Sequence, residues 1–300
     1  MPAETKAGFA VIVNGSGGRA KREGSLLGPR LTAAFARHGV SIEPRIVPGA
    51  ELEQAIKEAA RNTCVVVGGG DGTLGTAAHV VSQEGQTMAL LPLGTLNHLS
   101  LDLQIPADLD QAAAIAVHGA TETIDLGDVN GITFVNNASI GLYARMVRSR
   151  DARALPKWLA TFPAAWTALK ALKRRTIEME ADGRLRRIVT PLLFVGNNHY
   201  AIGGARRGHR ASLTDGKLSV YAVRERSIGG LLLFALRALI GRADPARDFI
   251  GIADLPELTV LGEGAIAVAH DGEVKTLRLP LCFRVRPAAL RIKVPAGPQM

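Results

Sequence analysis

The chain has 300 residues, which is long enough for a well-buried core and close to the size at which one core divides into two. Hydrophobic residues make up 47% and aromatic residues only 4%, with 33 Gly and 15 Pro, which excludes a disordered chain and indicates an aliphatic core. The formal net charge of +9 predicts a polyanionic partner and leaves three kinds open: nucleic acid, an anionic membrane surface, and phosphate groups of a substrate.

The first 125 residues alternate strand-like and helix-like segments. Apolar runs predict strands at Phe9–Val13, Ser41–Val47, Thr63–Val67 and Thr87–Leu91. Apolar residues at helical spacing predict helices at Leu26–His38, Glu51–Arg61 and Thr73–Ser82. Such alternation is typical of a doubly wound parallel sheet with nucleotide sites at the carboxyl ends of its strands. We therefore expect an α/β nucleotide-binding domain over residues 1–125.

Glycine-rich loops follow three of these predicted strands, at Asn14–Gly18, Gly68–Leu74 and Leu91–His98. Glycine lets backbone N–H groups approach phosphate oxygens, and a helix N-terminus adds a partial positive charge. Each loop alone is weak support, but the carboxyl ends of parallel strands meet at one edge of a sheet. The sequence thus predicts one phosphate site made by three loops, without a Walker lysine.

Asp71 is the acidic residue of the second loop. A carboxylate beside phosphate is repulsive unless a cation lies between them, so a magnesium contact is expected there. The alternative is a structural turn in which Asp71 caps the following helix.

From about Ile124 the pattern changes to short strand-like runs separated by Gly, Asn and Asp. These runs are Phe134–Ala138, Thr176–Ala181, Leu192–Val195, Leu218–Val223, Leu258–Leu261, Ala265–Val268 and Leu281–Val285. They predict an antiparallel β-sandwich domain over residues 126–300, whose C-terminal segment is a candidate to return to the first domain. Two helical insertions are expected, at Pro156–Arg175 and Ile228–Gly241.

Asp271 and Glu273 are separated by a single glycine. In an extended segment, residues two apart face the same side, so both carboxylates could serve one site, one as a base and the other as its orienter or metal contact. A surface turn with two solvated acids is the alternative.

Taken together, these motifs resemble the diacylglycerol kinase catalytic-domain family, which is related to sphingosine kinases and NAD kinases. The matching motifs cover nearly the whole chain: Asn14–Gly17, Gly69–Thr73, Pro92–Asn97, Ile124–Gly127, Phe134–Gly141, Val195–Asn198, Asp215–Leu218 and His270–Glu273. The Gly-Gly-Asp-Gly-Thr core is shared by the wider superfamily, whereas the downstream series narrows the resemblance to lipid kinases and their bacterial relatives.

The resemblance implies a kinase that uses ATP and Mg²⁺ to phosphorylate a lipid hydroxyl such as that of diacylglycerol. It implies nucleotide-site roles for Asn14, Ser16, Gly17, Gly69, Gly70, Asp71, Gly72, Thr73, Leu74, Thr95, Asn97 and Asp125. It also implies catalytic roles for Asp71, Asp271 and Glu273, with the base in the Asp-Gly-Glu motif. A structural magnesium site is implied at Ser212, Asp215 and the Lys217 carbonyl, although the residues alone read equally well as a turn.

Two departures from the family pattern are visible. His98 stands where many members carry Asp, and the first loop reads Asn-Gly-Ser-Gly-Gly rather than Asn-Pro-x-Ser-Gly. The geometry of the metal site or the choice of substrate could therefore differ from that of other family members. Two other functions also remain open: a soluble-substrate kinase of the NAD-kinase type, and a catalytically silent nucleotide-binding regulator.

The expected location is cytoplasmic, with peripheral contact to a membrane surface where the lipid lies. No segment reaches the roughly 18 apolar residues of a membrane span. Trp158, Phe162 and Trp166 lie on one face of the first helical insertion, which either contacts lipid or packs on the β domain.

The basic residues lack interleaved aromatics, so no nucleic-acid partner is expected. Cys64 and Cys282 are expected to be buried. The acceptor lipid is left open, and so is the oligomeric state, for which a homodimer is compatible.

Overall fold

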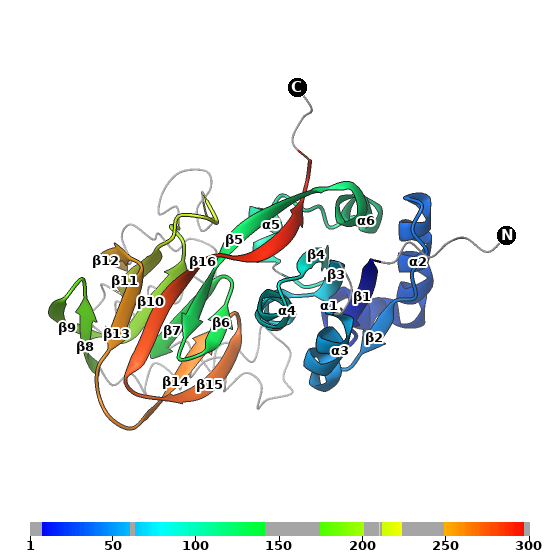
Figure 1. Cartoon of the computed structure of the whole chain (residues 1–300). Coiled ribbons are helices and arrows are strands. Elements are labelled where there is room, and N and C mark those ends of the chain that lie inside the picture. The colour runs from blue at the N-terminus through cyan, green and yellow to red at the C-terminus, as the bar shows by residue number, and fades with distance from the viewer. Residues whose placement is uncertain are drawn as a thin grey trace. The chain divides into compact units, whose positions relative to one another are not determined.

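The structure is a computed structural model that describes residues 8–60, 64–95, 97–141, 175–200, 210, 212–223 and 249–296. It divides into two compact units, Met1–Leu126 with Arg286–Met300, and Gly127–Val285 (Figure 1). The second unit is thus inserted in sequence between two segments of the first. The predicted helical insertion at Ile228–Gly241, and that at Pro156–Arg175 apart from its last residue, lie outside the described residues.

The first unit is built on a parallel sheet in the order β2-β1-β3-β4-β16. These strands are β1 (Phe9–Asn14), β2 (Arg45–Val47), β3 (Cys64–Gly69), β4 (Thr87–Pro92) and the C-terminal part of β16 (Leu281–Val294). Every residue of β3 and β4 is buried, as expected for central parallel strands covered on both faces.

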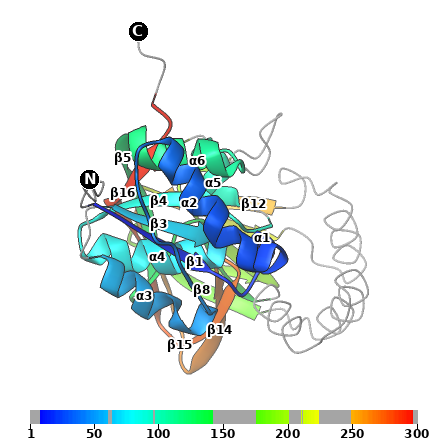
Figure 2. The same cartoon turned by 90° about the vertical axis from the view of Figure 1, so that its right-hand side faces the viewer.

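The helices of this unit are α1 (Gly18–Glu23), α2 (Leu27–Arg37), α3 (Leu52–Ala59), α4 (Asp71–Gln83), α5 (His98–Asp102) and α6 (Leu109–His118), with short 3₁₀ turns η1 (Gly24–Leu26) and η2 (Gly49–Glu51). Figure 2 shows α2 and α6 on one face of the sheet and α3 and α4 on the other. The predicted doubly wound α/β lobe is therefore confirmed.

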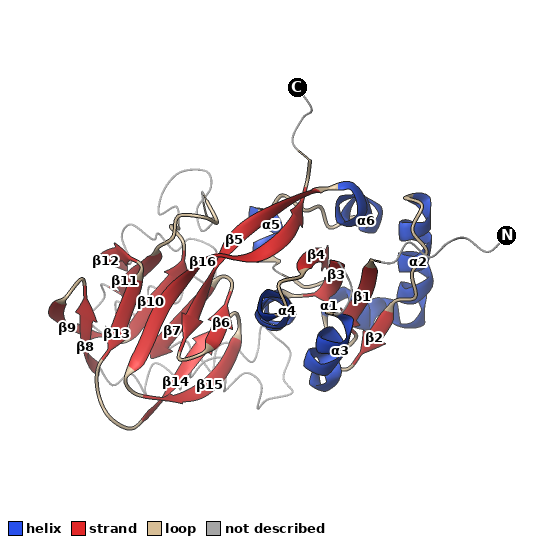
Figure 3. Cartoon of the chain, viewed as in Figure 1, coloured by secondary structure: helices blue, strands red, loops and turns tan. Residues whose placement is uncertain are grey.

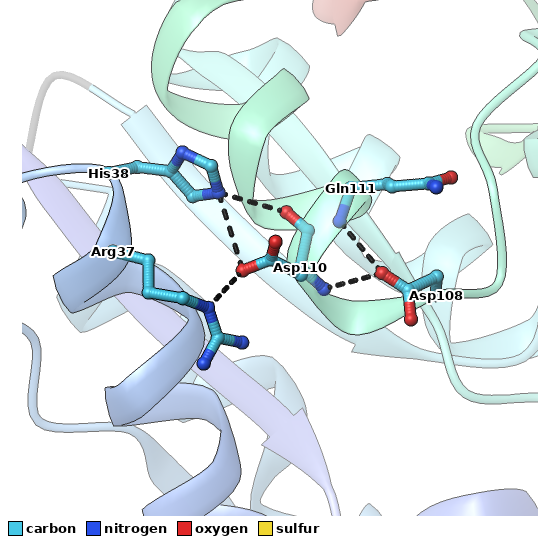
Figure 4. A network of polar contacts seen from close by, with 5 residues as sticks. All are labelled: Arg37, His38, Asp108, Asp110 and Gln111. Atoms are coloured by element: carbon cyan, nitrogen blue, oxygen red, sulfur yellow. Dashed lines mark hydrogen bonds and ion pairs between the residues drawn. The ribbon is translucent and has the colours of Figure 1, made fainter.

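Polar contacts join α2 to α6 where α2 ends (Figure 4). Arg37 donates from Nε to Asp110 Oδ1 at 2.6 Å, and His38 Nε2 lies 3.2 Å from the Asp110 carbonyl oxygen. Asp108 caps α6 by accepting the backbone N–H groups of Asp110 and Gln111, both at 3.0 Å. These contacts fix the two helices that cover one face of the sheet.

The second unit is an antiparallel β-sandwich, as predicted. One six-stranded sheet has the order β12-β11-β10-β7-β14-β15, and the facing strands include β16, β13, β8 and β9 with the β5–β6 hairpin. Their bounds are β5 (Ala120–Val129), β6 (Ile132–Phe134), β7 (Asn137–Gly141), β8 (Arg175–Ala181), β9 (Arg184–Thr190), β10 (Leu192–Asn197), β11 (Leu218–Val223), β12 (Phe249–Leu255), β13 (Glu257–Val260), β14 (Ala265–His270) and β15 (Glu273–Arg278). The described elements of this unit are all strands (Figure 3).

The core of the sandwich is aliphatic with few aromatic rings. Phe134 and Phe283 are both almost fully buried and pack with Ile, Leu, Val, Met and Ala side chains from both sheets. Burial of such side chains stabilises a fold by about 1.5–3 kcal/mol each. The low aromatic content of the sequence is thus compatible with a well-formed core.

Three sequence predictions are corrected. The strand predicted at Phe134–Ala138 is broken, because the backbone N–H groups of its middle residues bond to the Asp271 carboxylate instead of a strand. The strand predicted from Ser41 begins only at Arg45, because Pro44 has no N–H to give to a sheet. Cys64 is buried, but Cys282 is exposed since it alternates with the inward-facing Leu281 and Phe283 of β16.

Among the described helices, none is both long and apolar enough to cross a bilayer.

Candidate functional site

The glycine-rich loops of the first unit meet one another. Asn14, at the end of β1, donates from Nδ2 to Thr73 Oγ1 in the second loop at 2.9 Å. Arg19, at the start of α1, donates its backbone N–H to the carbonyl oxygen of Leu93 in the third loop at 2.8 Å. The predicted convergence of the loops after β1, β3 and β4 is therefore observed.

A fourth segment joins this cluster, and the sequence analysis missed it. Gly49, in η2 after β2, donates its N–H to Ser16 Oγ at 2.9 Å, while the Ser16 N–H bonds to Asn14 Oδ1 at 2.9 Å. The Pro48-Gly49 pair at the carboxyl end of β2 was the available signal for it. Ser16 is thus held from two sides, with its side chain committed to the neighbouring loop.

The loops approach so closely that side chains would not fit between them. A Cβ atom added to Gly94 would lie 2.4 Å from Gly70 Cα, and one added to Gly18 would lie 2.1 Å from the Leu93 carbonyl oxygen. Gly18 also has φ +58, a conformation that L side chains rarely adopt. Backbone atoms therefore make the closest approach between these loops, and glycine at these positions suits a phosphate group that must approach N–H donors.

Asp71 is the first residue of α4, a helix of 13 residues, and it is half-buried. The N-cap is Gly70, whose backbone is extended and which makes no side-chain cap bond. The alternative in which Asp71 caps the helix is therefore not what the structure shows. A carboxylate in the first turn of a helix, beside glycine-rich loops, fits a hard cation that accompanies phosphate.

Asn97 shapes the third loop through both of its amide atoms. Its Oδ1 accepts the Gly94 N–H at 2.9 Å and its Nδ2 donates to the Gly94 carbonyl oxygen at 3.2 Å. Asn97 itself has φ 53, which Asn tolerates better than most residues. Thr95 and His98, on either side, are both exposed.

Asp125, on β5, is buried at 2% exposure. Its Oδ1 accepts the backbone N–H of Ala288 at 2.9 Å, where β16 carries a residue with φ 49. The side chain thus anchors the returning strand, a contact that the sequence alone did not indicate.

In the second unit, Asp271 is buried at 7% exposure and its carboxylate accepts three backbone N–H groups. Oδ2 accepts from Val135 at 2.6 Å, and Oδ1 accepts from Asn136 at 2.8 Å and from Asn137 at 3.2 Å. Burial raises the pKa of Asp271 to about 6, against the opposing effect of these bonds and of the Arg210 charge.

The segment from Asp271 to Glu273 is a turn and not an extended strand, so the premise that both carboxylates share one side is wrong. Asp271 and Gly272 have φ values of 43 and 88 and join β14 to β15, with His270 paired to Glu273. Positive φ at both central residues is typical of a tight hairpin turn. The turn carries one buried acid, so the alternative of two solvated acids is also wrong.

Glu273, the first residue of β15, is exposed. Neighbouring protein removes part of its water and raises the pKa of its carboxyl group above the ordinary value, while the nearby Lys275 charge opposes the shift. The two acids of the motif therefore have different environments, one bonded to backbone and one accessible.

The loop predicted to hold a structural magnesium ion lies next to Asn198. The Asp215 N–H bonds to Asn198 Oδ1 at 3.0 Å, Asp215 Oδ2 accepts from the His199 N–H at 3.3 Å, and the Lys217 carbonyl accepts from the Asn198 N–H at 2.9 Å. Ser212 Oγ accepts the Thr214 N–H at 3.1 Å. In the described part of the chain no group of three His, Cys, Asp or Glu side chains could hold a metal, so a site here would need carbonyl and water ligands.

Arg210 belongs to a basic run with Arg206, Arg207 and His209, for which the sequence leaves two readings open: contact with phosphate or lipid head groups, and a solvated surface loop. The structure shows Arg210 buried at 6% exposure, donating from Nη2 to Asn136 Oδ1 at 2.9 Å. The solvated reading is therefore wrong for Arg210, whose partners lie far away in the sequence.

Comparisons with known proteins agree with this architecture. Residues 8–129 match the model of the diacylglycerol kinase catalytic domain, and residues 136–294 match the YegS C-terminal NAD kinase beta sandwich-like domain. The chain is 33% identical over 260 residues to a "Probable lipid kinase YegS-like" protein of Pseudomonas aeruginosa, covering 82% of this chain and 80% of that protein.

Two further relatives come from Bacillus species. A diacylglycerol kinase of Bacillus subtilis is 27% identical over 198 residues, covering 64% of this chain and 65% of that protein. A crystal structure described as a diacylglycerol kinase from Bacillus anthracis superposes with a TM-score of 0.67 at 19% identity, covering 98% of this chain and 99% of the other. This last likeness supports the fold alone.

Proposed function

The chain belongs to the diacylglycerol kinase catalytic-domain family, and on that basis we propose that it transfers the γ-phosphoryl group of ATP to the hydroxyl group of a lipid. Family membership makes the chain a kinase; the nucleotide, the metal and the acceptor are the proposed parts. The names of its relatives, lipid kinase and diacylglycerol kinase, favour a lipid acceptor. A lipid acceptor would be met at a membrane surface by peripheral contact.

The observation that carries the proposal is the meeting of glycine loops at the carboxyl ends of β1, β3 and β4. The bond from Asn14 to Thr73 and the close approach of Gly70 to Gly94 bring these glycine-rich loops together beside the N-terminus of α4. Backbone N–H donors and a helix N-terminus suit the phosphates of ATP, because both present positive charge to an anion.

Asp71 is proposed to hold Mg²⁺ together with the phosphates. When bound, Mg²⁺ neutralises charge on the phosphate oxygens during transfer. The residues present fit this group, since the carboxylate of Asp71 lies in the first turn of α4, next to the glycine-rich loops.

Of the two acids in the Asp-Gly-Glu motif, Glu273 is proposed as the base that accepts the proton of the lipid hydroxyl. Its side chain is exposed, and its raised pKa makes its carboxylate a stronger base than an ordinary glutamate. Asp271 is less suited, because both of its oxygens already accept backbone N–H groups. We assign Asp271 to holding the turn from which Glu273 extends.

The test is transfer of labelled γ-phosphate from ATP to a total lipid extract and to diacylglycerol in detergent micelles, with and without Mg²⁺. A labelled lipid that requires Mg²⁺ and is lost in Asp71→Ala and Glu273→Ala would support the proposal. Label on NAD instead of lipid would favour a soluble-substrate kinase. Binding of ATP with no transfer to either acceptor would favour a nucleotide-binding regulator.

A further inference from the structure

A short backbone segment of the second unit, Val135–Asn137, is held from two sides. It connects β6 to β7 and ends on the first residue of β7, and on one side its N–H groups bond to the Asp271 carboxylate. On the other side its carbonyl oxygens accept bonds from Arg210, Asn197 and Tyr200. Buried backbone groups need partners, and those of this segment are largely side chains from distant parts of the chain instead of a neighbouring strand, so these side chains determine where the segment lies.

Arg210 supplies the charged part of this arrangement. Its Nη1 donates to the Val135 carbonyl oxygen at 2.6 Å, and its Nη2 donates to Asn136 Oδ1 at 2.9 Å. The guanidinium carbon lies 5.9 Å from the centre of the Tyr200 ring. A guanidinium can bond two acceptors at once because its donors form a rigid planar fork, which a lysine ammonium does not have.

The same segment determines where the hairpin turn lies. Asp271 accepts from all three N–H groups of Val135–Asn137 and returns its own N–H to the Asn137 carbonyl oxygen at 3.1 Å. Only Gly272 separates Asp271 from Glu273. A shift of the segment therefore moves the turn, and the turn moves the first residue of β15.

We propose that Arg210 is a positioning residue for Glu273. It fixes Val135–Asn137, the segment to which the Asp271–Gly272 turn is bonded, and so sets the direction in which the Glu273 carboxylate points. This inference rests on the proposed function, in which Glu273 accepts the proton of the lipid hydroxyl. Arg210 itself touches neither substrate nor reacting atoms in this account.

Arg210 also has an electrostatic effect that a purely steric support would lack. The charged and titratable groups around the turn are Arg210, His270, Glu273 and Lys275, and the Arg210 charge lowers the pKa of Asp271 against the effect of burial. Without that charge, Asp271 would take up a proton at higher pH. A proton on the carboxyl group competes with the backbone N–H donors for its oxygens, so the turn would loosen.

The experiment compares Arg210→Met and Arg210→Lys with wild type, using diacylglycerol micelles as the acceptor. Arg187→Met is the matched control, because that side chain is 71% exposed and lies on β9. In both Arg210 variants kcat should fall by about 10- to 100-fold, since small displacements of a reacting group are costly. KM for ATP should stay within about twofold, because ground-state binding of the nucleotide is unaffected.

The pH profile separates positioning from simple loss of folded protein. In Arg210→Met the acid limb of kcat/KM should move to higher pH, whereas in Arg210→Lys it should stay near its wild-type position while kcat remains low. A smaller folded fraction lowers the rate at each pH only in proportion to that fraction, which circular dichroism measures at the same pH values. A loss of rate that the folded fraction accounts for at every pH would overturn the inference, as would wild-type kcat in Arg210→Met.

A milder variant covers the case in which Arg210→Met does not fold. Tyr200→Phe keeps the ring and removes the hydroxyl group that donates to the Asn136 carbonyl oxygen at 2.8 Å. It should lower kcat with KM for ATP unchanged, and an unchanged kcat would overturn the inference. If the wild-type protein phosphorylates no lipid, the proposed function is wrong and the inference about Arg210 is wrong with it. If the wild-type protein is active and the Arg210 variants have the same kcat, only the inference about Arg210 is wrong.

Discussion

At the residue scale, Asp71 is the side chain on which the proposed chemistry of the first unit most depends. Asp71→Asn keeps the shape of the residue and removes the charge that would hold Mg²⁺. We expect kcat to fall by at least about 10- to 100-fold, the loss typical even of outer-shell metal partners. Kinase activity titrated with Mg²⁺ measures this, because the variant should need a higher concentration.

Asp182→Asn is the control for that charge change. Asp182 is exposed in the turn between β8 and β9 with φ 51, a conformation that Asn also tolerates. It should leave activity unaltered. An Asp71→Asn enzyme with wild-type dependence on Mg²⁺ would contradict the assignment of that residue.

Neighbouring buried groups, His270 and Asp271, give the second unit an unusual pH response. Burial lowers the pKa of His270 to about 4 and raises that of Asp271 to about 6. The folded state therefore keeps the Asp271 proton more tightly than the unfolded chain does, so that contribution to stability is lost as pH rises through about 6. The His270 contribution has the opposite sign and is lost as pH falls from about 6.5 through about 4.

Single substitutions should reveal the separate effects of Asp271 and His270 on how stability changes with pH. Relative to wild type, Asp271→Asn should gain stability as pH rises from about 4 to 6, and His270→Gln should lose it, each by about 3 kcal/mol at most. Urea unfolding at a series of pH values measures both slopes. Parallel curves for all three proteins would show that neither group titrates in this range.

At the element scale, the loops around α4 depend on backbone contact. Gly94→Ala would bring a methyl group against Gly70, where a Cβ would lie 2.4 Å from Cα, so the third loop must move. We expect ATP affinity to fall by about tenfold or more, equal to 1.4 kcal/mol. Isothermal titration with ATP and Mg²⁺ would measure the change.

Gly28→Ala is the matched substitution for this test. Gly28 lies inside α2, and its added Cβ would make only an ordinary contact with Ile46 Cδ1 at 3.9 Å. Alanine favours a helix over glycine by up to about 1 kcal/mol, so this variant should be as stable as wild type or more so, with unchanged affinity. Equal losses in both variants would mean that the first unit is sensitive to any glycine replacement.

Strands with continuous apolar runs were predictable from sequence, and edge strands rich in charged residues were not. β11 was predicted with its observed bounds, Leu218–Val223, because all its residues are buried. β9 and β15 lie at the ends of their sheets and carry several charged residues, so apolar alternation is too weak to reveal them. α1 and α5, with 6 and 5 residues, are too short to show a helical period.

The candidate site was predictable where glycine marks a loop and not where a distant residue fixes it. The loops at Asn14, Gly70 and Gly94 were found because their composition is local information. The bond from Val135 to Asp271 joins residues 136 positions apart, and nothing local to either indicates it. For that reason the Asp271–Glu273 turn was predicted with the wrong geometry.

At the scale of the whole molecule, the first unit is assembled from both ends of the chain. The C-terminal part of β16 buries Leu290, Ile292 and Val294 and pairs with β4. Asp125 and the carbonyl oxygen of Gly119 also bond to this segment. Burial of three aliphatic side chains is worth about 5–9 kcal/mol, which is comparable to the whole stability of a typical domain.

Truncation after Val285 should therefore unfold the first unit. We expect the truncated chain to lose ATP binding and the part of the α-helical circular dichroism signal that comes from α1 to α6, since all the described helices lie in that unit. A truncated chain that binds ATP like wild type would refute this. Removal of the residues after Ala296 is the control, because it spares β16.

The same topology sets an order of events during synthesis. Proteins generally fold from the N-terminus as they leave the ribosome. Here the sheet that carries the glycine loops lacks its β16 neighbour until Leu281–Val294 has been made, long after β1, β3 and β4 have emerged. The nascent protein must therefore carry an incomplete first unit while its inserted β-sandwich is translated.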